Sequence, residues 1–253
     1  MLSVDQIKTY NTDGLVKSST QLSSDKVKNL NSALDKYLED HKDENNEFVS
    51  GLYERDNKFL EFAMYPEIIS EVKQLIGEDI ILWGSSLFCK KEKNGKETPW
   101  HQDGEYWPIR PLATCTVWIA LDASTAANGC LRVIPGSHKT KQLAKHHHSD
   151  ASNIALHLEL DESEFDETKA VDIVLEPGEI SLHDVYLYHG SEPNTSDHSR
   201  RGMTLRYMPT SSVYYHLDGS KTETSERLDL SNRTLYLMRG TDVSGQNDFR
   251  VRY

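Results

Sequence analysis

Apolar residues recur at helical spacing in three segments of the first 78 or so residues. A short helix is predicted after Ser3, because Ser3 and Gln6 have the spacing of a capping box. A second is predicted within residues 24–40, where the apolar side chains fall on one helical face. A third begins at Pro66 and ends at Gly77, since proline suits the first turn of a helix and glycine its end. All three are expected to pack outside a core formed by the rest of the chain.

From Ile80 onward the apolar runs become short and rich in β-branched and aromatic residues, with Gly, Pro and Asn between them. They occupy residues 80–90, 114–122, 130–135, 171–189 and 203–209. This spacing predicts many antiparallel strands, as in a jelly roll or a similar closed double-sheet structure with a mouth for a ligand.

The pattern therefore predicts a single, mainly β domain with flanking helices. Its helical part covers about 1–78, its β core about 79–210 and a C-terminal extension about 211–253. Two polar stretches, 92–97 and 139–169, are predicted to be loops.

Composition and charge narrow the range of partners. The chain has 253 residues, of which 37% are hydrophobic, and a formal net charge of −12. An acidic surface repels nucleic acid and anionic lipid, so a small-molecule partner is favoured over nucleic acid or membrane. The sequence contains no apolar run long enough to cross a membrane and no signal-peptide pattern, so a cytoplasmic location is expected. The oligomeric state is left open.

One short motif indicates metal chemistry. His101 and Asp103 are two residues apart, so on an extended strand both side chains leave the same face and can bind one ion. His189 ends a distant apolar strand beside a Gly-Ser turn and is the best candidate for a third ligand. Two histidines and one carboxylate form a facial triad that suits Fe(II) and leaves three coordination positions open.

Three motifs follow one another along the chain: PWHQDGEYWPIRP at 99–111, NGCLRVIPGSH at 128–138, and HGSEPN at 189–194 with an arginine following. Through these motifs, in this order, the sequence resembles the phytanoyl-CoA dioxygenase family of Fe(II)/2-oxoglutarate oxygenases. The resemblance implies a double-stranded β-helix, a jelly-roll variant related to the cupins. It also implies that His101, Asp103 and His189 are the catalytic iron ligands, and that 2-oxoglutarate and O2 are co-substrates.

The same resemblance implies a set of residues around 2-oxoglutarate. Arg200, eleven residues after His189, matches the arginine that holds the far carboxylate, and guanidinium geometry suits such a pairing. Arg201 would point to the other side of a strand. Ser191 matches a hydroxyl donor to that carboxylate, and Gln102 and Trp118 match positions in the co-substrate pocket. Lys90 or Lys91 could add a second cation.

Residues of the substrate pocket are less clearly marked. Glu105, Tyr106, Trp107 and Arg110 follow the metal motif and could line its mouth, although Tyr106 and Trp107 could equally pack the end of the strand. Arg132 and Arg206 join Arg110 as candidate cations for an anionic substrate, although a structural role alone is favoured for the motif around Arg132.

Several histidines have simpler interpretations than metal binding. His183 shares a strand face with His189 and is a rival ligand, but a buried histidine beside the site is favoured. His138 is expected to hydrogen-bond a loop, and His146, His147 and His148 to lie in a solvated one.

The resulting prediction is a hydroxylase of a small polar or anionic metabolite, such as an organophosphonate, an amino-acid-like compound or a natural product. Asp103 favours hydroxylation, because halogenating relatives carry a small residue there; desaturation and ring closure stay open. The alternatives are an acyl-CoA hydroxylase, a non-catalytic cupin-like module that binds metal and 2-oxoglutarate, and a zinc isomerase or hydrolase.

Overall fold

The predicted helices are present in the structure, a computed structural model that describes residues 1–44, 46–150, 154–216 and 233–252. They are α1 (Val4–Asp13), α2 (Ser24–Asp40) and α5 (Pro66–Ile76). Ser3 and Gln6 form the predicted capping box, and Pro66 opens α5. Two short helices that the sequence pattern did not indicate, α3 (Leu52–Arg55) and α4 (Asn57–Ala63), lie between α2 and α5.

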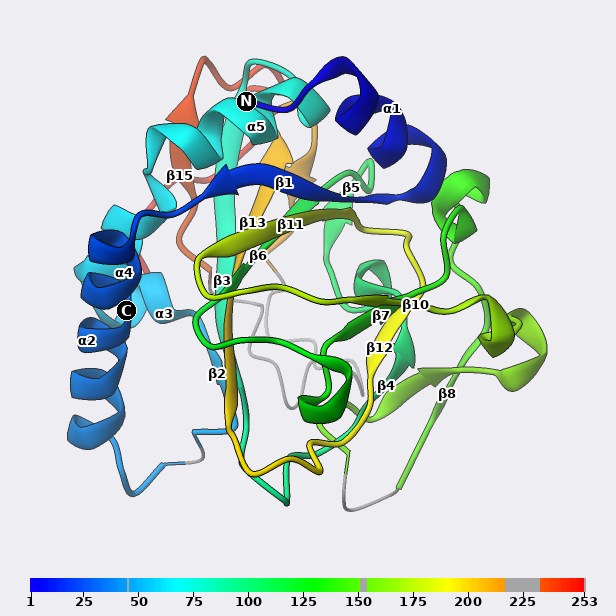
Figure 1. Ribbon diagram of the computed structural model, residues 1–253. Helices are drawn as coiled ribbons and strands as arrows, with labels where there is room; N and C mark the ends of the chain where they lie inside the picture. Colours follow the sequence, from blue (N-terminus) through cyan, green and yellow to red (C-terminus); the bar gives the residue numbers. More distant parts are fainter. Residues whose placement is uncertain (45, 151–153, 217–232, 253) are drawn as a thin grey trace.

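The described strands form two main antiparallel sheets, so the fold combines helices with antiparallel β-structure (Figure 1). The large sheet has the order β1 (Leu15–Gln21), β11 (Glu179–Asp184), β6 (Cys115–Ala120), β13 (Arg200–Pro209), β3 (Ile80–Lys90) and β15 (Tyr236–Arg239), with β2 (Phe48–Ser50) also paired to β3. The small sheet has the order β10 (Val171–Ile173), β7 (Leu131–Val133), β12 (His189–Ser191) and β4 (Thr98–His101). A further ribbon pairs β5 (Ile109–Arg110) with β14 (Val213–Tyr214).

The strands differ from the sequence-based prediction in two places. The large sheet extends beyond residues 79–210, because β1 and β2 come from the part expected to be helical and β15 from the C-terminal extension. The expectation of a loop over residues 139–169 was wrong in part: β8 (His146–His148) pairs with β9 (Leu158–Leu160) inside it. The sequence carries a signal for β9, because Leu156, Leu158 and Leu160 recur at every second position, whereas the three histidines of β8 show no such alternation.

The large sheet separates the hydrophobic core from a polar interior. Along β6, Val117 and Ile119 point into the core beneath the helices, whereas Thr116 and Trp118 point the other way. Strand β13 alternates in the same manner, so its even-numbered residues share the polar side. In Figure 1 the helices lie to the left of and above the large sheet, and the small sheet lies on its other side.

Gly202 on β13 is required by close packing. A Cβ atom at this position would lie 2.1 Å from Cζ2 of the buried Trp118 ring. We therefore expect Gly202→Ala to destabilise the protein by about 1–3 kcal/mol through overpacking. For a chain of this size, that corresponds to a loss of roughly 2–12 °C in Tm, measured by thermal unfolding.

Gly84→Ala is the matched control, because Gly84 lies on the neighbouring strand β3 and its Cβ would meet Arg206 at an ordinary 3.5 Å. An unchanged Tm for Gly202→Ala would contradict the close packing described for Trp118.

Candidate active site

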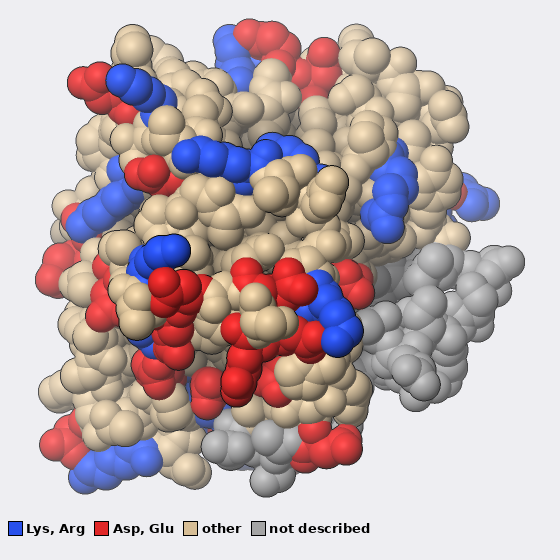
Figure 2. Space-filling model, turned by 90° about the vertical axis from the view of Figure 1, so that its right-hand side faces the viewer, with Lys and Arg blue, Asp and Glu red and all other residues tan. Residues whose placement is uncertain are grey.

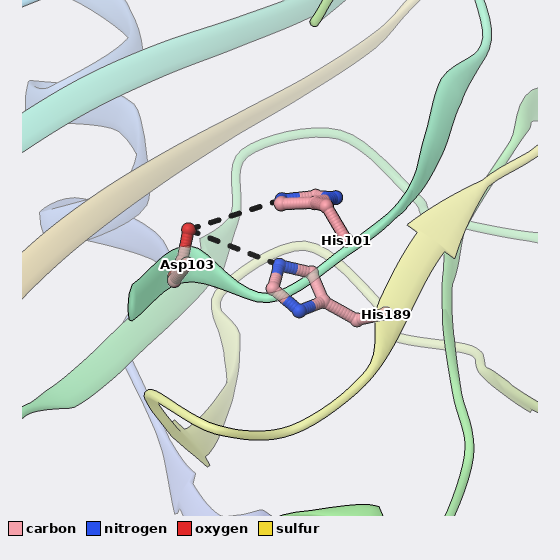
Figure 3. Close-up of side chains that lie close together, drawn as sticks. All are labelled: His101, Asp103 and His189. Carbon is pink, nitrogen blue, oxygen red and sulfur yellow. Dashed lines mark ion pairs between the residues drawn. The ribbon is translucent and has the colours of Figure 1, made fainter. Parts of the chain in front are cut away.

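The three predicted metal ligands meet at one point between the two sheets (Figure 3). His101 ends β4, and His189 lies directly opposite it at the start of β12. Asp103 follows β4 in a short 3-10 turn rather than in the strand itself, but the intervening residue is extended, so both side chains still reach the same side. The ligand atoms of His101, Asp103 and His189 lie within 4.8 Å of one another. All three residues are buried.

Each imidazole is held with one nitrogen directed at the common point. Nδ1 of His101 lies 2.8 Å from the carbonyl oxygen of Pro99, and Nδ1 of His189 lies 2.9 Å from that of Leu187. Nδ1 therefore donates the proton and Nε2 keeps its lone pair for a metal. The two Nε2 atoms lie 3.9 and 4.0 Å from Oδ1 of Asp103. Burial lowers the pKa of both histidines, which favours the neutral form that binds metals.

The second oxygen of Asp103 contacts the protein. The Thr116 hydroxyl donates to Oδ2 over 3.3 Å, and Nε2 of His183 lies 3.6 Å from the same oxygen. Burial raises the pKa of the Asp103 carboxyl, but His183, His189, Arg206 and His101 together lower it well below its ordinary value. His183 thus contacts the carboxylate and lies outside the three-residue cluster, in agreement with the expectation that it is not a ligand.

The triad opens into a central cavity whose empty space, open solvent at its mouth included, is about 710 Å³. Arg200 lines this cavity, and the side chain is 4% exposed. Its guanidinium lies 5.5 Å from the centre of the Trp118 ring, its Nε atom has no hydrogen-bond partner, and it forms no ion pair with any described residue. Burial lowers the pKa of Arg200 to about 10. A buried cation of this kind fits a carboxylate ligand, as 2-oxoglutarate would supply.

The neighbouring arginine faces the opposite way. Arg201 forms a paired contact with Asp122, with Nε and a terminal nitrogen each 2.9 Å from a carboxylate oxygen. It also reaches Asp35 on α2 at 2.6 Å. Arg201 therefore links the sheet to a helix and only Arg200 enters the cavity, as strand alternation predicts.

The other residues predicted around 2-oxoglutarate divide into two pairs. Ser191 and Trp118 line the central cavity with Arg200. Gln102 does not line the cavity. Its amide instead forms hydrogen bonds with the backbone of Gln142, Ala144 and Tyr186, and so links these segments to the end of β4.

Lys90 also lies outside the central cavity. It is the cross-strand neighbour of Arg200 in the β3–β13 pair. Its ammonium donates to the carbonyl oxygens of Ser191 and Glu192 at 3.1 and 2.5 Å. Burial, reinforced by the charge of Arg200, lowers the pKa of Lys90 to about 6. Lys91 is exposed and lies 3.8 Å from Glu47.

Three of the six candidate substrate residues line the central cavity, namely Tyr106, Trp107 and Arg206. The other three do not. Glu105 is exposed, and Arg110 is exposed with its guanidinium bonded to the carbonyls of Trp107 and Ile109. Arg132 is engaged by three carboxylates, from Glu167, Asp172 and Glu192. Because Arg132 is already held in these ion pairs, a structural role for the NGCLRVIPGSH motif is the better interpretation than substrate binding.

Several lining residues were missed by the sequence analysis. They are mostly apolar or aromatic and come from six separate segments: Phe48, Phe88, Thr98, Leu131, Leu156 and Thr204. Thr204 could have been found, since it shares the face of Arg200 on β13. Phe48 and Leu156 carried no signal, because only tertiary packing brings β2 and the segment before β9 to the site.

The histidines with simpler interpretations have ordinary contacts. Nε2 of His138 lies 3.2 Å from the carbonyl oxygen of Asn11 in α1. In β8, His147 lies between Asp161 and Glu159 at 2.7 and 3.0 Å, and Nε2 of His146 accepts from the backbone of Gln102. The three residues 146–148 therefore form a paired strand and not the predicted loop.

Acidic side chains gather on the face drawn in Figure 2, which is the right-hand side of Figure 1. The insert that contains β8 and β9 lies on this side, and its exposed acids include Glu162, Glu164, Asp166 and Glu167. Lys and Arg side chains also lie on this face, in a row above the acidic cluster in Figure 2. Among the described residues, no helix is long and apolar enough to cross a membrane.

Comparison with known proteins identifies the family. The model of the family described as phytanoyl-CoA dioxygenase (PhyH) matches residues 10–202. A Caenorhabditis elegans protein described as a probable phytanoyl-CoA dioxygenase is 31% identical over 194 residues, which cover 71% of this chain and 61% of that protein. This chain spans about three fifths of the length of that protein and two similar relatives, which are covered to 61%, 59% and 62%.

Solved structures share the fold. ThoJ, a non-haem monooxygenase in its apo form, superposes with a TM-score of 0.75 at 24% identity, covering 98% of this chain and 88% of that one. EvdO2 from Micromonospora carbonacea, complexed with 2-oxoglutarate, superposes with a TM-score of 0.69 at 22% identity, covering 83% and 91%. With a family match over most of its length and the metal triad in place, the chain belongs to the phytanoyl-CoA dioxygenase family of Fe(II)/2-oxoglutarate-dependent oxygenases.

Proposed function

We propose that this protein is a 2-oxoglutarate-dependent dioxygenase that hydroxylates a small organic substrate, on a double-stranded β-helix. The observation that carries the proposal is the buried guanidinium of Arg200, which faces the same cavity as His101, Asp103 and His189 without a counter-ion among the described residues. A zinc isomerase or hydrolase with the same three ligands would leave this costly charge without a purpose. The 2-oxoglutarate complex of EvdO2, which has the same fold, supports the assignment.

The residues of the chain would divide the work as follows. His101, Asp103 and His189 would hold iron on one face, leaving the cavity side open. Arg200, with the Ser191 hydroxyl, would hold the far carboxylate of 2-oxoglutarate above the Trp118 ring. When bound, iron and 2-oxoglutarate supply the oxidation: 2-oxoglutarate, O2 and a C–H bond give succinate, CO2 and an alcohol.

The cavity walls bear on the substrate. Beside the polar residues of the metal site, they include the apolar and aromatic side chains of Phe48, Phe88, Tyr106, Trp107 and Leu131. This lining favours a compact substrate with an apolar body. The cluster of acids on the face in Figure 2 would repel the phosphates of coenzyme A at that place, although relatives are named for activity on a coenzyme A thioester.

Succinate formation tests the proposal. Iron-loaded protein incubated with 2-oxoglutarate and oxygen is expected to release succinate slowly even without a primary substrate, and His101→Ala and Arg200→Ala should each abolish the release. His147→Ala is the control, because His147 is a half-exposed histidine outside the cavity. Succinate release that persists in both variants would overturn the proposal, and tight 2-oxoglutarate binding without succinate would point to a non-catalytic module.

A further inference from the structure

A second buried arginine lies in the central cavity, on the same strand as Arg200. Arg206 is 9% exposed and lines the cavity. One terminal nitrogen donates to the Ser86 hydroxyl at 2.8 Å, while Nε has no hydrogen-bond partner. Arg206 forms no ion pair with any residue in the described ranges. The charge is therefore desolvated and pairs directly with no carboxylate of the described residues; the nearby Asp103 offsets only part of the cost of burial, and a ligand anion would lower it further.

Strand register places Arg206 at the Asp103 end of the triad. Arg206 lies opposite Thr116 in the β13–β6 pair, and the Thr116 hydroxyl donates to Asp103. His183, which contacts the same carboxylate, lies opposite Thr116 on the other side. The guanidinium of Arg206 also lies 5.3 Å from the centre of the Trp107 ring. Arg206 therefore shares its surroundings with the metal site and with the aromatic wall of the cavity.

The two arginines enter the cavity at different points along β13. They are six residues apart on one strand, which separates their Cα atoms by about 20 Å. If 2-oxoglutarate spans from Arg200 to the metal, Arg206 remains beyond the metal, on the side left for the primary substrate.

We propose that Arg206 binds a carboxylate of the primary substrate, with the apolar body of that substrate packed against Trp107 and Tyr106. This inference rests on the proposed function, since it takes Arg200 as the co-substrate residue. Arg206 is then the specificity-determining residue, and the substrate class is a small monocarboxylate with an aromatic or branched apolar body. A substrate carboxylate paired with the buried guanidinium would lie close to the metal. The carbon that is oxidised would therefore lie within a few bonds of that carboxylate.

A matched pair of probes tests the inference: 3-phenylpropionate and its neutral amide, 3-phenylpropanamide. Their affinities are measured by titration calorimetry without oxygen, with the protein loaded with Fe(II) and 2-oxoglutarate. The carboxylate is expected to bind at least about tenfold more tightly than the amide, since charge-assisted pairing with a buried guanidinium is strong. Arg206→Gln should abolish this preference, and Arg206→Lys should restore part of it.

Arg110→Gln is the control, because it makes the same change at an exposed arginine outside the cavity and should keep the full preference. Equal binding of the two probes by the unmodified protein, no saturable binding of the carboxylate, or an unchanged preference in Arg206→Gln would each overturn the inference.

A purely electrostatic role beside Asp103 predicts a different result. In that case Arg206→Gln would weaken Co(II) binding and leave the ratio of the two probe affinities unchanged, which also overturns the inference. Succinate release by the unmodified protein without any probe reports separately on the proposed function, so failure of one does not imply failure of the other.

Discussion

Replacing Arg200 with Met is expected to weaken 2-oxoglutarate binding at least about thirtyfold. Removing one partner of a buried, hydrogen-bonded charge pair costs about 2–5 kcal/mol, and each 1.4 kcal/mol is a factor of ten in affinity. Arg200 is buried, lines the cavity of the metal triad and has no counter-ion among the described residues, so the carboxylate of the ligand would be its direct partner. Calorimetric titration of the metal-loaded variant with 2-oxoglutarate measures the loss.

The same substitution should stabilise the ligand-free protein. Burial lowers the pKa of Arg200 to about 10, below that of an unfolded arginine. Since the folded pKa is the lower one, the unfavourable free energy of burying the charge is fully present at neutral pH and fades only as the pH rises above 10. It amounts to about 3 kcal/mol, so Arg200→Met should have a higher Tm than the unmodified protein at pH 7 without ligand.

Arg201→Met provides the opposite pattern. It removes the ion pairs with Asp122 and Asp35, so its Tm should fall while its affinity for 2-oxoglutarate stays unchanged. An Arg200→Met protein that binds 2-oxoglutarate normally would exclude Arg200 as the co-substrate residue.

Removing His189 should abolish metal binding, whereas removing His183 should only weaken it. The two rings are 5.0 Å apart, but only His189 belongs to the cluster with His101 and Asp103. His183 contacts the Asp103 oxygen that faces away from the cluster, and changes to such supporting residues typically cost about 10–100-fold in metal affinity. The paired variants His189→Ala and His183→Ala, titrated with Co(II) and followed by visible absorption, measure both effects.

The reverse order, with His183→Ala losing the metal and His189→Ala keeping it, would mean that the rival histidine is the ligand. Thermal unfolding without metal serves as the control for folding, because both histidines are buried.

Strand alternation predicted the orientation of most inward-facing residues. It placed His101 and Asp103 together and separated Arg200 from Arg201, and the structure confirms both. By the same rule Gln102, between the two ligands, faces away from them, and its amide indeed binds backbone outside the cavity. Resemblance to relatives places Gln102 in the co-substrate pocket, whereas in the structure this residue does not line the cavity that Arg200 enters.

Tertiary pairing explains what the sequence did not reveal. Residues 15–21 are mostly polar and lie between two helices, so their place at the edge of the large sheet depends on β11, more than 150 residues away. The contacts of Arg132 depend likewise on acids from three other segments. Local patterns contain no information on partners that folding brings together from such distances.

The alternation of charge along β13 also affects how faithfully the chain folds. A shift of one residue in its pairing would turn Arg200 and Arg206 into the apolar layer beneath the helices and bring Leu205 and Tyr207 into the cavity. Each misplaced guanidinium would cost several kcal/mol. The two buried charges destabilise the correct structure, but they destabilise structures with β13 out of register more strongly. The strand that carries the ligand-binding arginines is therefore held in its correct register.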